Sequence, residues 1–504
     1  MKTLNFQSNV NKPVRSPRAV SGAFSHSEFF RKLTLLLLVS SLVCLGGAPS
    51  RAEIRAVTAN PGENCSTQIN IGWHADLAET SCSLVITEKH DSGWAHAKIV
   101  PGESRPSEVF DGIDSKTPEG KDWKEEAKFL DYGVLLTGLK PDTDYMYKVR
   151  AGNGEETTAT RYFKTAGASE FSFAWISDVH VYTPIPNRAK NLNKVFEAAI
   201  KIQPSVDFVF STGDVVAWGG SYSFWKSLFE QPFAANYMFA DVIGNHDWMM
   251  RGKGGDSEFF DVAHNNPRNG YAGQEGVCYW FIYGDVLFLT FNNEDMRTSA
   301  EAEAVAKAWA AGVIEKQKGK YQRIVIAEHY PWFDGRNGKT SWYDNWKDFC
   351  DEHHVTLALS GHNHVYQRTH PLWDDQVVAD GLGTVYMVAP SSDGERGVKA
   401  GPLTMNADKL AFTYSSQLHS NETEVRTIGC VLVDVAPNSI KTRLVYLDDN
   451  KQVQVGDEHT IQTLPSHAPR PGLPTKRPAK EKPTATPAPP AASPAAMVPS
   501  GTGY

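Results

Sequence analysis

The 504-residue chain has few cysteines, no excess of basic charge and only one long hydrophobic run. Its net charge is −8, with acidic and basic residues mixed along the chain, so nothing in the charge indicates nucleic-acid binding. None of the six cysteines has the spacing of a zinc-ligating pair, which argues against a thiolate metal site. These absences leave a globular chain of several domains whose chemistry must come from other residue types.

The strongly apolar run, residues 33–48, follows two basic residues and precedes small ones. It is short for a membrane span and typical of a secretory signal peptide, so we expect cleavage near Ala52 and a secreted, periplasmic or cell-envelope protein without a stable span. The stretch before it is unusually long, which leaves open a later start codon or an uncleaved anchor. Cys65 and Cys82 flank one predicted hairpin and are candidates for a disulfide.

Hydrophobic patterning divides the remainder into three parts after the leader, 1–52. Residues 53–167 carry short alternating runs between Gly, Pro and Asp turns, which predicts an all-β sandwich. From 168 to 463, strands alternate with helices and the chain then returns to strands, which predicts an α/β layered domain. Residues 464–504 are rich in Pro and Ala, and we expect a disordered tail.

One segment of the β part carries a more specific signal. The string LTGLKPDTDYMYKVR (136–150) resembles the loop and tyrosine-bearing strand of fibronectin type III domains. The resemblance implies that Tyr145 supplies the corner hydroxyl. Any β-hairpin with a Pro-Asp turn is the alternative.

Five polar clusters in the α/β part each follow a predicted strand, where open sheets of this class place their ligands. In chain order they are SDVH (177–180), GDVVAWG (213–219), GNHD (244–247), EHYPWF (328–333) and SGHNH (360–364). Their candidate metal ligands are Asp178, His180, Asp214, Asn245, His329, His362 and His364. Seven ligands are too many for one zinc ion. Two divalent ions that share a carboxylate would use them all, and oxygen and imidazole donors suit Fe, Mn or Zn.

This ordered set resembles the calcineurin-like metallophosphoesterases over residues 171 to about 400. The resemblance implies an α/β layered domain with two β-sheets flanked by helices. Within that superfamily the purple acid phosphatases are most similar, because they also place a fibronectin-like domain first and share segments similar to GHNHVYQRTHPL, HYPWF and GTVYMV. The chain departs from them at two positions. Ala217 stands where they have a tyrosine that ligates ferric iron, and His180 stands where they have glycine.

The resemblance implies that the His180 imidazole fills the place of the missing phenolate. It assigns the ligands of one metal as Asp178, His180 and His364. It assigns those of the other as Asn245, His329 and His362, with Asp214 bridging the two. We therefore expect a site of two divalent metals without a phenolate-to-iron charge-transfer band.

The resemblance also implies hydrolysis of a small phosphate ester by a metal-bridging hydroxide, with His246 as general acid for the leaving group. Asp247 is expected beside it, either orienting a neighbouring ring or amide or capping the turn after GNH. Candidate substrate-binding residues are Trp248, Tyr330, Tyr366 and Arg368, with core packing as the alternative for the aromatic ones.

An acid-phosphatase-like phosphomonoesterase is the leading hypothesis. The first-motif DxH pattern also occurs in diesterases, so a cyclic-nucleotide or phospholipid diesterase is the alternative. A non-catalytic protein that binds an envelope or polymer is a third hypothesis. The natural substrate, the metal pair and the oligomeric state stay open at this point.

Overall fold

The computed structural model describes residues 53–113, 123–155, 158–183, 187–250, 254–255, 257–334, 338–339, 341–392, 407–413, 428–448, 450 and 452–475. The predicted signal peptide and most of the predicted tail lie outside these residues. Within the described part of the chain, none of the helices has the length and apolar character needed to cross a membrane.

The N-terminal β-domain consists of two four-stranded antiparallel sheets, with the orders β1-β2-β6-β5 and β4-β3-β7-β8. Its strands are β1 (Ile54–Pro61), β2 (Ile69–Ala75), β3 (Ser83–Glu88), β4 (Lys98–Pro101), β5 (Glu103–Ile113), β6 (Trp123–Leu136), β7 (Asp144–Arg150) and β8 (Arg161–Lys164). The Tyr145 hydroxyl accepts a hydrogen bond of 3.0 Å from the Lys140 amide, which ties the preceding loop to β7. The predicted sandwich and its tyrosine corner are confirmed.

The predicted disulfide between Cys65 and Cys82 is wrong. Both are free thiols, buried in the apolar core of the β-domain. The Cys65 thiol donates to the Gly62 carbonyl, and the Cys82 thiol to the Glu79 carbonyl. Burial raises the pKa of both thiols, so each behaves as a small core residue.

The α/β domain contains two large sheets. The six-stranded sheet has the order β11-β10-β9-β25-β26-β27 and consists of β9 (Phe171–Ile176), β10 (Val206–Ser211), β11 (Met238–Asp241), β25 (Ile428–Ala436), β26 (Ser439–Leu447) and β27 (Val453–Gln462). The seven-stranded sheet has the order β14-β15-β16-β19-β23-β20-β24 and consists of β14 (Trp280–Tyr283), β15 (Val286–Thr290), β16 (Arg323–Ala327), β19 (Leu357–Ser360), β20 (Gln367–Thr369), β23 (Val385–Val388) and β24 (Leu410–Thr413).

Helices and short hairpins complete this domain. The helices are α2 (Asn187–Ile202), α3 (Tyr222–Phe229), α4 (Pro232–Ala235), α5 (Asn245–Trp248), α6 (Glu258–Ala263), α7 (Asn293–Met296), α8 (Ala300–Lys316), α9 (Ser341–Glu352) and the 3₁₀ turn η1 (Ala407–Lys409). The hairpins pair β12 (Met249–Met250) with β13 (Gly254–Gly255), β17 (Phe333–Asp334) with β18 (Gly338–Lys339), and β21 (Leu372–Trp373) with β22 (Gln376–Val377).

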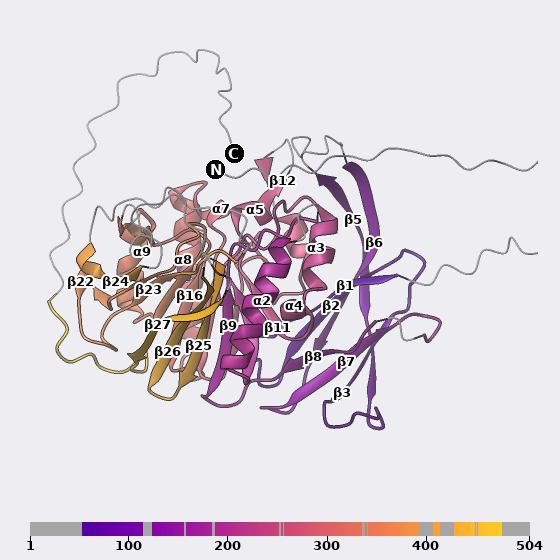
Figure 1. The fold of residues 1–504 in the computed structure, drawn as a ribbon, viewed down its shortest axis with the longest axis horizontal. Coiled ribbons are helices and arrows are strands. Elements are labelled where there is room, and N and C mark those ends of the chain that lie inside the picture. The colour runs from indigo at the N-terminus through magenta and orange to yellow at the C-terminus, as the bar shows by residue number, and fades with distance from the viewer. Residues whose placement is uncertain are drawn as a thin grey trace, which may run out of the picture. The chain divides into compact units, whose positions relative to one another are not determined.

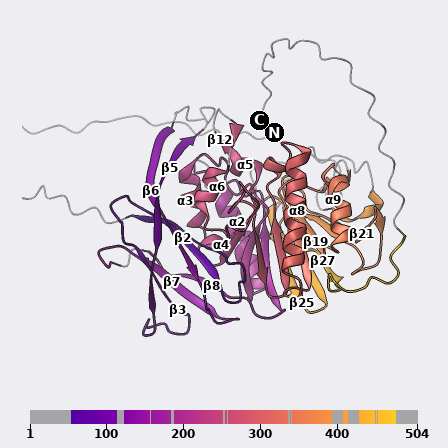
Figure 2. The same cartoon turned by 180° about the vertical axis from the view of Figure 1, so that it is seen from behind.

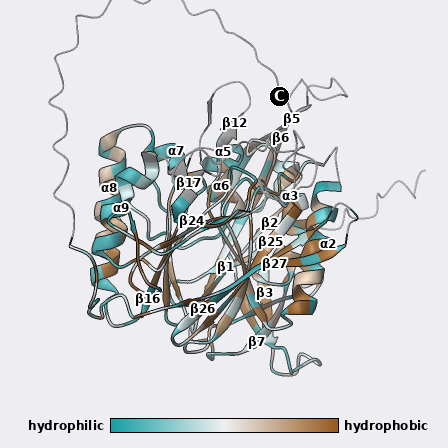
Figure 3. Cartoon of the chain, turned by 60° about the vertical axis from the view of Figure 1, so that its left-hand side comes forward, coloured by the Kyte–Doolittle hydropathy of each residue, from teal (hydrophilic) through white to brown (hydrophobic). Residues whose placement is uncertain are grey.

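The two large sheets pack face to face because their central strands, such as β9, β10, β15 and β16, are buried and largely apolar. Phe173 and Phe208 of the six-stranded sheet contact Phe288 of the other sheet, with ring centroids 5.8 and 5.9 Å apart. Helix α2 covers the outer face of the six-stranded sheet, and α8 and α9 cover that of the seven-stranded sheet (Figures 1 and 2). Figure 3 shows the hydrophobic colour along the strands between these helices. The predicted α/β layers are confirmed.

The topology places the ends of many strands at one edge. Strands β9, β10 and β11 run parallel, and so do β15, β16, β19 and β23. Parallel strands share the edge at which they all end, and loops there carry ligands in open α/β folds. Helices α5 and α7 begin at this edge, at the top of Figure 1.

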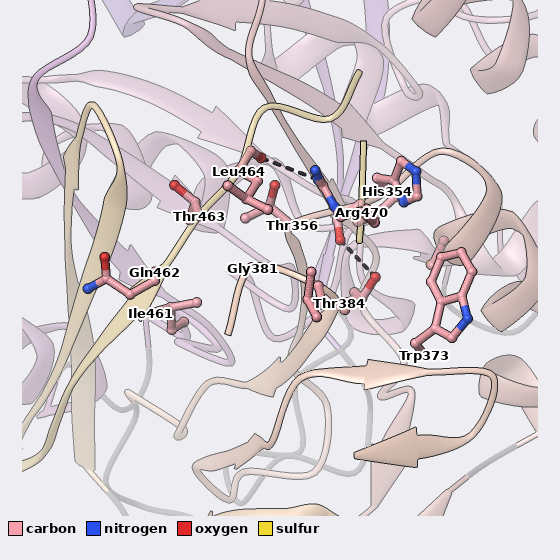
Figure 4. Close-up of a pocket in the computed structure, with 14 residues that line it drawn as sticks. His354, Thr356, Trp373, Gly381, Thr384, Ile461, Gln462, Thr463, Leu464 and Arg470 are labelled. Atoms are coloured by element: carbon pink, nitrogen blue, oxygen red, sulfur yellow. Dashed lines mark hydrogen bonds between the residues drawn. The ribbon is translucent and has the colours of Figure 1, made fainter. Parts of the chain in front are cut away.

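The chain remains packed beyond residue 464, where the tail was predicted to begin. The Ser466 amide donates to the Gln322 carbonyl, and the Ser466 side chain is 7% exposed. Arg470 donates to the carbonyls of Pro465 and Leu464, as seen in part in Figure 4. Ser466 therefore holds this segment against the α/β domain, and the predicted tail beyond residue 475 lies outside the described residues.

Candidate metal centre

The candidate ligands follow the strands on a strained backbone. Most have a positive φ, a conformation that residues other than glycine avoid and that concentrates at functional sites. The values are 53° for Asp178, 47° for His180, 54° for Asp214, 68° for His362 and 57° for His364. The chain thus turns sharply as it leaves each strand, which allows side chains from both sheets to converge.

One group of ligand atoms joins the first and last motifs. Asp178, His180 and His364 each offer an atom, and these atoms lie within 4.8 Å of one another. His364 Nε2 lies 3.3 Å from Asp178 Oδ1, an atom that is buried and has no hydrogen-bond donor. All three side chains are nearly inaccessible to solvent. This is the set predicted to hold one metal.

A second group joins the remaining motifs. Asp214, His329 and His362 also place their ligand atoms within 4.8 Å of one another. Asn245 Oδ1 lies 3.2 Å from His329 Nε2 and 3.0 Å from His362 Nδ1. The latter two nitrogens are themselves only 3.2 Å apart. Ligand atoms that point at one shared position lie this close to one another, and these two nitrogens and the amide oxygen do so.

Asp214 lies between the two groups. Its Oδ2 atom is 3.3 Å from His180 Nε2 and 3.2 Å from His329 Nε2. His180 Nδ1 faces the Asp178 carbonyl, and His329 Nδ1 faces that of Thr212, so each Nδ1 carries a proton and each Nε2 is left as a metal-ligating atom. The Asp214 oxygen therefore lies between the Nε2 atoms of His180 and His329, which is the position expected of a ligand that bridges two metals.

The electrostatics of the cluster favour positive charge. Burial lowers the pKa of His329, but the Asp214 carboxylate more than offsets this effect and raises it to about 10. Burial opposes ionisation of Asp178, yet His364 and His329 lower its pKa to about 2. A buried site with two ionised carboxylates needs cations, and this set of oxygen and imidazole donors fits two divalent metals.

Comparison with known families agrees with this geometry. Residues 171–366 match the family described as calcineurin-like phosphoesterase. Residues 54–165 match the family described as purple acid phosphatase, N-terminal domain. The chain contains a calcineurin-like phosphoesterase domain. The β-domain that precedes it is a purple acid phosphatase N-terminal domain.

Similar proteins match large parts of this chain at low sequence identity. Two uncharacterized proteins from two strains of Mycobacterium tuberculosis are each 21% identical over 343 residues, covering 62% of this chain and 61% of theirs. A purple acid phosphatase from yellow lupin (Lupinus luteus) seeds is similar in structure, with a TM-score of 0.60, 17% identity and coverage of 81% of this chain and 74% of that one. A PhoD structure gives a TM-score of 0.53 at 14% identity, with 81% and 90% covered. At such identities the structures support the fold.

His246 of the phosphoesterase domain lies beside the ligand cluster. Its backbone amide donates to Asp214 Oδ1 at 2.7 Å, and its ring centroid is 4.8 Å from that of His180. Its Nδ1 atom is 2.8 Å from the Ala217 carbonyl oxygen, to which it must donate. Nε2 is therefore the atom through which His246 can exchange a proton.

Asp247 acts on the backbone. Its Oδ2 atom accepts from the amides of Asp214 and Gly244 at 2.7 and 2.8 Å, and its Oδ1 atom accepts from the Val216 amide at 3.1 Å. The side chain is fully buried. Two roles were considered for it, orienting a neighbouring ring or amide and capping the turn after GNH. The bond from Gly244 caps that turn, and the bonds from Asp214 and Val216 join it to the turn that carries Asp214.

The four predicted substrate-binding residues are divided in space. Tyr330 lies at the cluster, with its ring centroid 4.5 Å from that of His362. Trp248 is half-buried at the end of α5 and packs against the apolar cluster that includes α2. The structure does not bring the polar ends of Tyr366 and Arg368 into the site.

Tyr366 and Arg368 instead bind one carboxylate of the last strand. The Tyr366 hydroxyl donates to Asp457 at 2.7 Å, and Arg368 donates to both oxygens of that carboxylate at 2.8 Å. The guanidinium and the carboxylate are 7% and 6% exposed. The three side chains thus fasten β27 to the region that follows the last motif, and the substrate-binding role expected for Tyr366 and Arg368 has no support in the structure.

Sequence reasoning missed a sixth polar cluster, which follows β15. Asn293, the first residue of α7, accepts from the backbone amides of His329 and Tyr330 at 2.8 and 2.9 Å and donates to Glu328 at 2.7 Å. It holds the fourth motif in place. Its only signal in the sequence is the pair of asparagines that ends a strand, which is weaker than a histidine or aspartate motif.

Proposed function

We propose that the chain is an exported dinuclear-metal phosphoesterase that hydrolyses small phosphomonoesters. The observation that carries the proposal is the convergence of ligand atoms on both sides of Asp214 Oδ2, with His246 beside them. The match of residues 171–366 to the phosphoesterase family supports the same reaction class. Export rests on the apolar run at 33–48, and sequencing the N-terminus of the mature protein tests it.

The ligands have distinct tasks in this proposal. One metal would be held by Asp178, His180 and His364, and the other by Asn245, His329 and His362, with Asp214 shared. When bound, two such cations lower the pKa of a shared water and neutralise charge on the phosphoryl oxygens. The buried, hydrogen-bonded imidazoles keep the donor atoms directed at the site before any substrate arrives.

His246 would donate the proton that the leaving alkoxide needs. Its Nδ1 is occupied by the Ala217 carbonyl, so proton transfer runs through Nε2. The Asp214 Oδ1 atom accepts from the His246 backbone amide, which keeps the residue beside the ligand cluster. General acid catalysis of this kind typically contributes about 10²- to 10⁴-fold in rate.

The test is a side-by-side assay of p-nitrophenyl phosphate and bis(p-nitrophenyl) phosphate, with the mature chain loaded in turn with Mn, Zn and Fe. We expect preference for the monoester. With phenyl phosphate, whose leaving group needs a proton, His246→Ala should lower kcat by about 10²-fold or more without loss of metal, whereas His90→Ala, an exposed histidine of the β-domain, should change neither.

Other outcomes separate the alternatives. Preference for the diester would replace the phosphomonoesterase by a phosphodiesterase, for which His180 in the first motif is the supporting feature. Absence of turnover on both esters with two metals bound would contradict the proposed activity and favour a binding protein.

A further inference from the structure

The β-domain contacts the phosphoesterase domain at helix α3, beside β1 and β5 in Figure 1. Tyr222, the first residue of α3, is 3% exposed, and its hydroxyl lies 2.7 Å from His74 Nδ1 and 3.2 Å from Arg55 Nε. His74 Nε2 faces the Val262 carbonyl at 2.9 Å, so Nε2 carries the proton and Nδ1 accepts the tyrosine hydrogen. The Tyr222 ring stacks on Phe129 with centroids 4.8 Å apart. The start of α3 is therefore fixed by residues of the β-domain.

Helix α3 in turn holds the loop of the second motif. Trp225, three residues after Tyr222, is fully buried, and its indole nitrogen donates to the Gly219 carbonyl at 2.8 Å. The Gly219 amide donates to the His246 carbonyl at 2.7 Å. A Cβ atom at position 219 would lie 1.7 Å from the Asp247 carbonyl oxygen, so only glycine permits this close approach of the two loops.

The same loop holds the His246 ring. The Ala217 carbonyl accepts from His246 Nδ1 at 2.8 Å, and the Trp218 ring lies against the imidazole with centroids 5.8 Å apart. Both the backbone and the side chain of His246 are thus held by residues 217–219. A displacement of α3 would pass to that loop and from there to the ring.

We propose that the N-terminal β-domain positions the general acid His246 through Tyr222, which makes Tyr222 a positioning residue for the reaction. The inference rests on the proposed function, since it requires that His246 donates a proton. Its physical basis is that proton transfer needs a donor aligned to within about 0.5 Å, whereas cations held by seven ligands tolerate a small shift of one loop. The β-domain would then be part of the catalytic unit.

Tyr222→Phe tests this inference because it removes only the hydroxyl that reaches His74 and Arg55. The assay is hydrolysis of a series of aryl phosphates from 2,4-dinitrophenyl phosphate, whose leaving group needs no proton, to phenyl phosphate, whose leaving group does. We expect kcat to fall about tenfold for phenyl phosphate and less than about twofold for the dinitrophenyl ester, with KM and metal content unchanged. Trp225→Phe, which removes the donor to Gly219, should give the same pattern.

Tyr145→Phe is the matched control, because it makes the same change at a buried tyrosine of the β-domain whose hydroxyl bonds locally, to Lys140. It should leave the dependence on the leaving group unchanged. A second readout is the His246 Nδ1–H resonance in histidine-labelled protein, which should broaden or shift in Tyr222→Phe and stay in place in Tyr145→Phe.

His246→Ala separates failure of this inference from failure of the proposed function. If His246→Ala slows phenyl phosphate selectively and Tyr222→Phe slows all esters equally or none, the positioning role is refuted and the proposed function stands. If His246→Ala itself shows no dependence on the leaving group, His246 is not the general acid and the inference falls with that role.

Discussion

Asp247 offers a stability test that depends only on backbone hydrogen bonds. In Asp247→Asn the amide oxygen can replace Oδ2 and keep the bonds from Asp214 and Gly244, but the amide nitrogen must then face the Val216 amide. Two donors oppose each other where no water enters, and an unsatisfied buried donor costs about 1 to 3 kcal/mol. Asp247→Ala leaves all three amides without an acceptor, and we expect a loss on the order of 5 kcal/mol.

The assay is equilibrium urea unfolding of the metal-free chain, with one m-value, the dependence of the unfolding free energy on urea concentration, used for all variants. The dissociation constant for zinc is measured for the same variants. Asp448→Asn is the matched control, because Asp448 also accepts backbone amides, those of Asn450 and Gln452, but on the surface. Its amides regain water, so we expect a much smaller loss. An Asp247→Asn variant within about 0.5 kcal/mol of the parent, with unchanged zinc affinity, would refute the reasoning.

Three further outcomes are expected. Burial lowers the pKa of His74 to about 3, below its unfolded value of about 6.5, so folding stability should fall as pH drops below about 6.5. Between pH 7 and 5 the metal-free parent should lose about 2 kcal/mol more stability than His74→Gln. Equal losses of the two proteins in urea unfolding would contradict this. Arg368→Met should cost about 3 to 5 kcal/mol because the buried Asp457 carboxylate loses its cation and keeps the Tyr366 hydroxyl, with KM for esters unchanged. A raised KM would restore Arg368 to the substrate site. Iron-loaded protein should lack a phenolate-to-iron absorption band, because position 217 is alanine and the Tyr330 hydroxyl donates to Glu294. A visible band would show that a tyrosine binds the iron.

The convergence of the candidate metal ligands could be predicted because polar residues after buried strands mark the shared edge of a parallel sheet. Asp178 and Asp214 follow neighbouring parallel strands, and the structure brings both together with histidines from the other sheet. The assignment of individual ligands to two ions needed the family resemblance, since spacing along the chain contains no distances between strands. The positive φ angles at these residues also leave no signal in the sequence, because none of them is a glycine.

Some contacts could not be foreseen because the partners are distant along the chain. Tyr366 and Arg368 stand next to the SGHNH motif, yet their partner Asp457 is about 90 residues away on β27. Cys65 and Cys82 flank the expected hairpin, but both serve as core residues, which depends on how the two sheets pack. In each case proximity in the sequence suggested a role that long-range packing decides.

The contact between domains was also beyond sequence reasoning. The β-domain could be recognised from its alternating runs, but no pattern indicates that His74 reaches Tyr222, 148 residues later. That contact joins a domain with no predicted chemical role to the loop beside His246. Only the structure suggests that the two domains act together.

The central claim is that two metals flank Asp214, and anomalous diffraction from zinc-loaded crystals tests it most directly. The account predicts two peaks about 3.5 to 4 Å apart, one near Asp178 and His364 and the other near Asn245 and His362, with the Asp214 carboxylate between them. A single peak, or two peaks that Asp214 does not bridge, would contradict it.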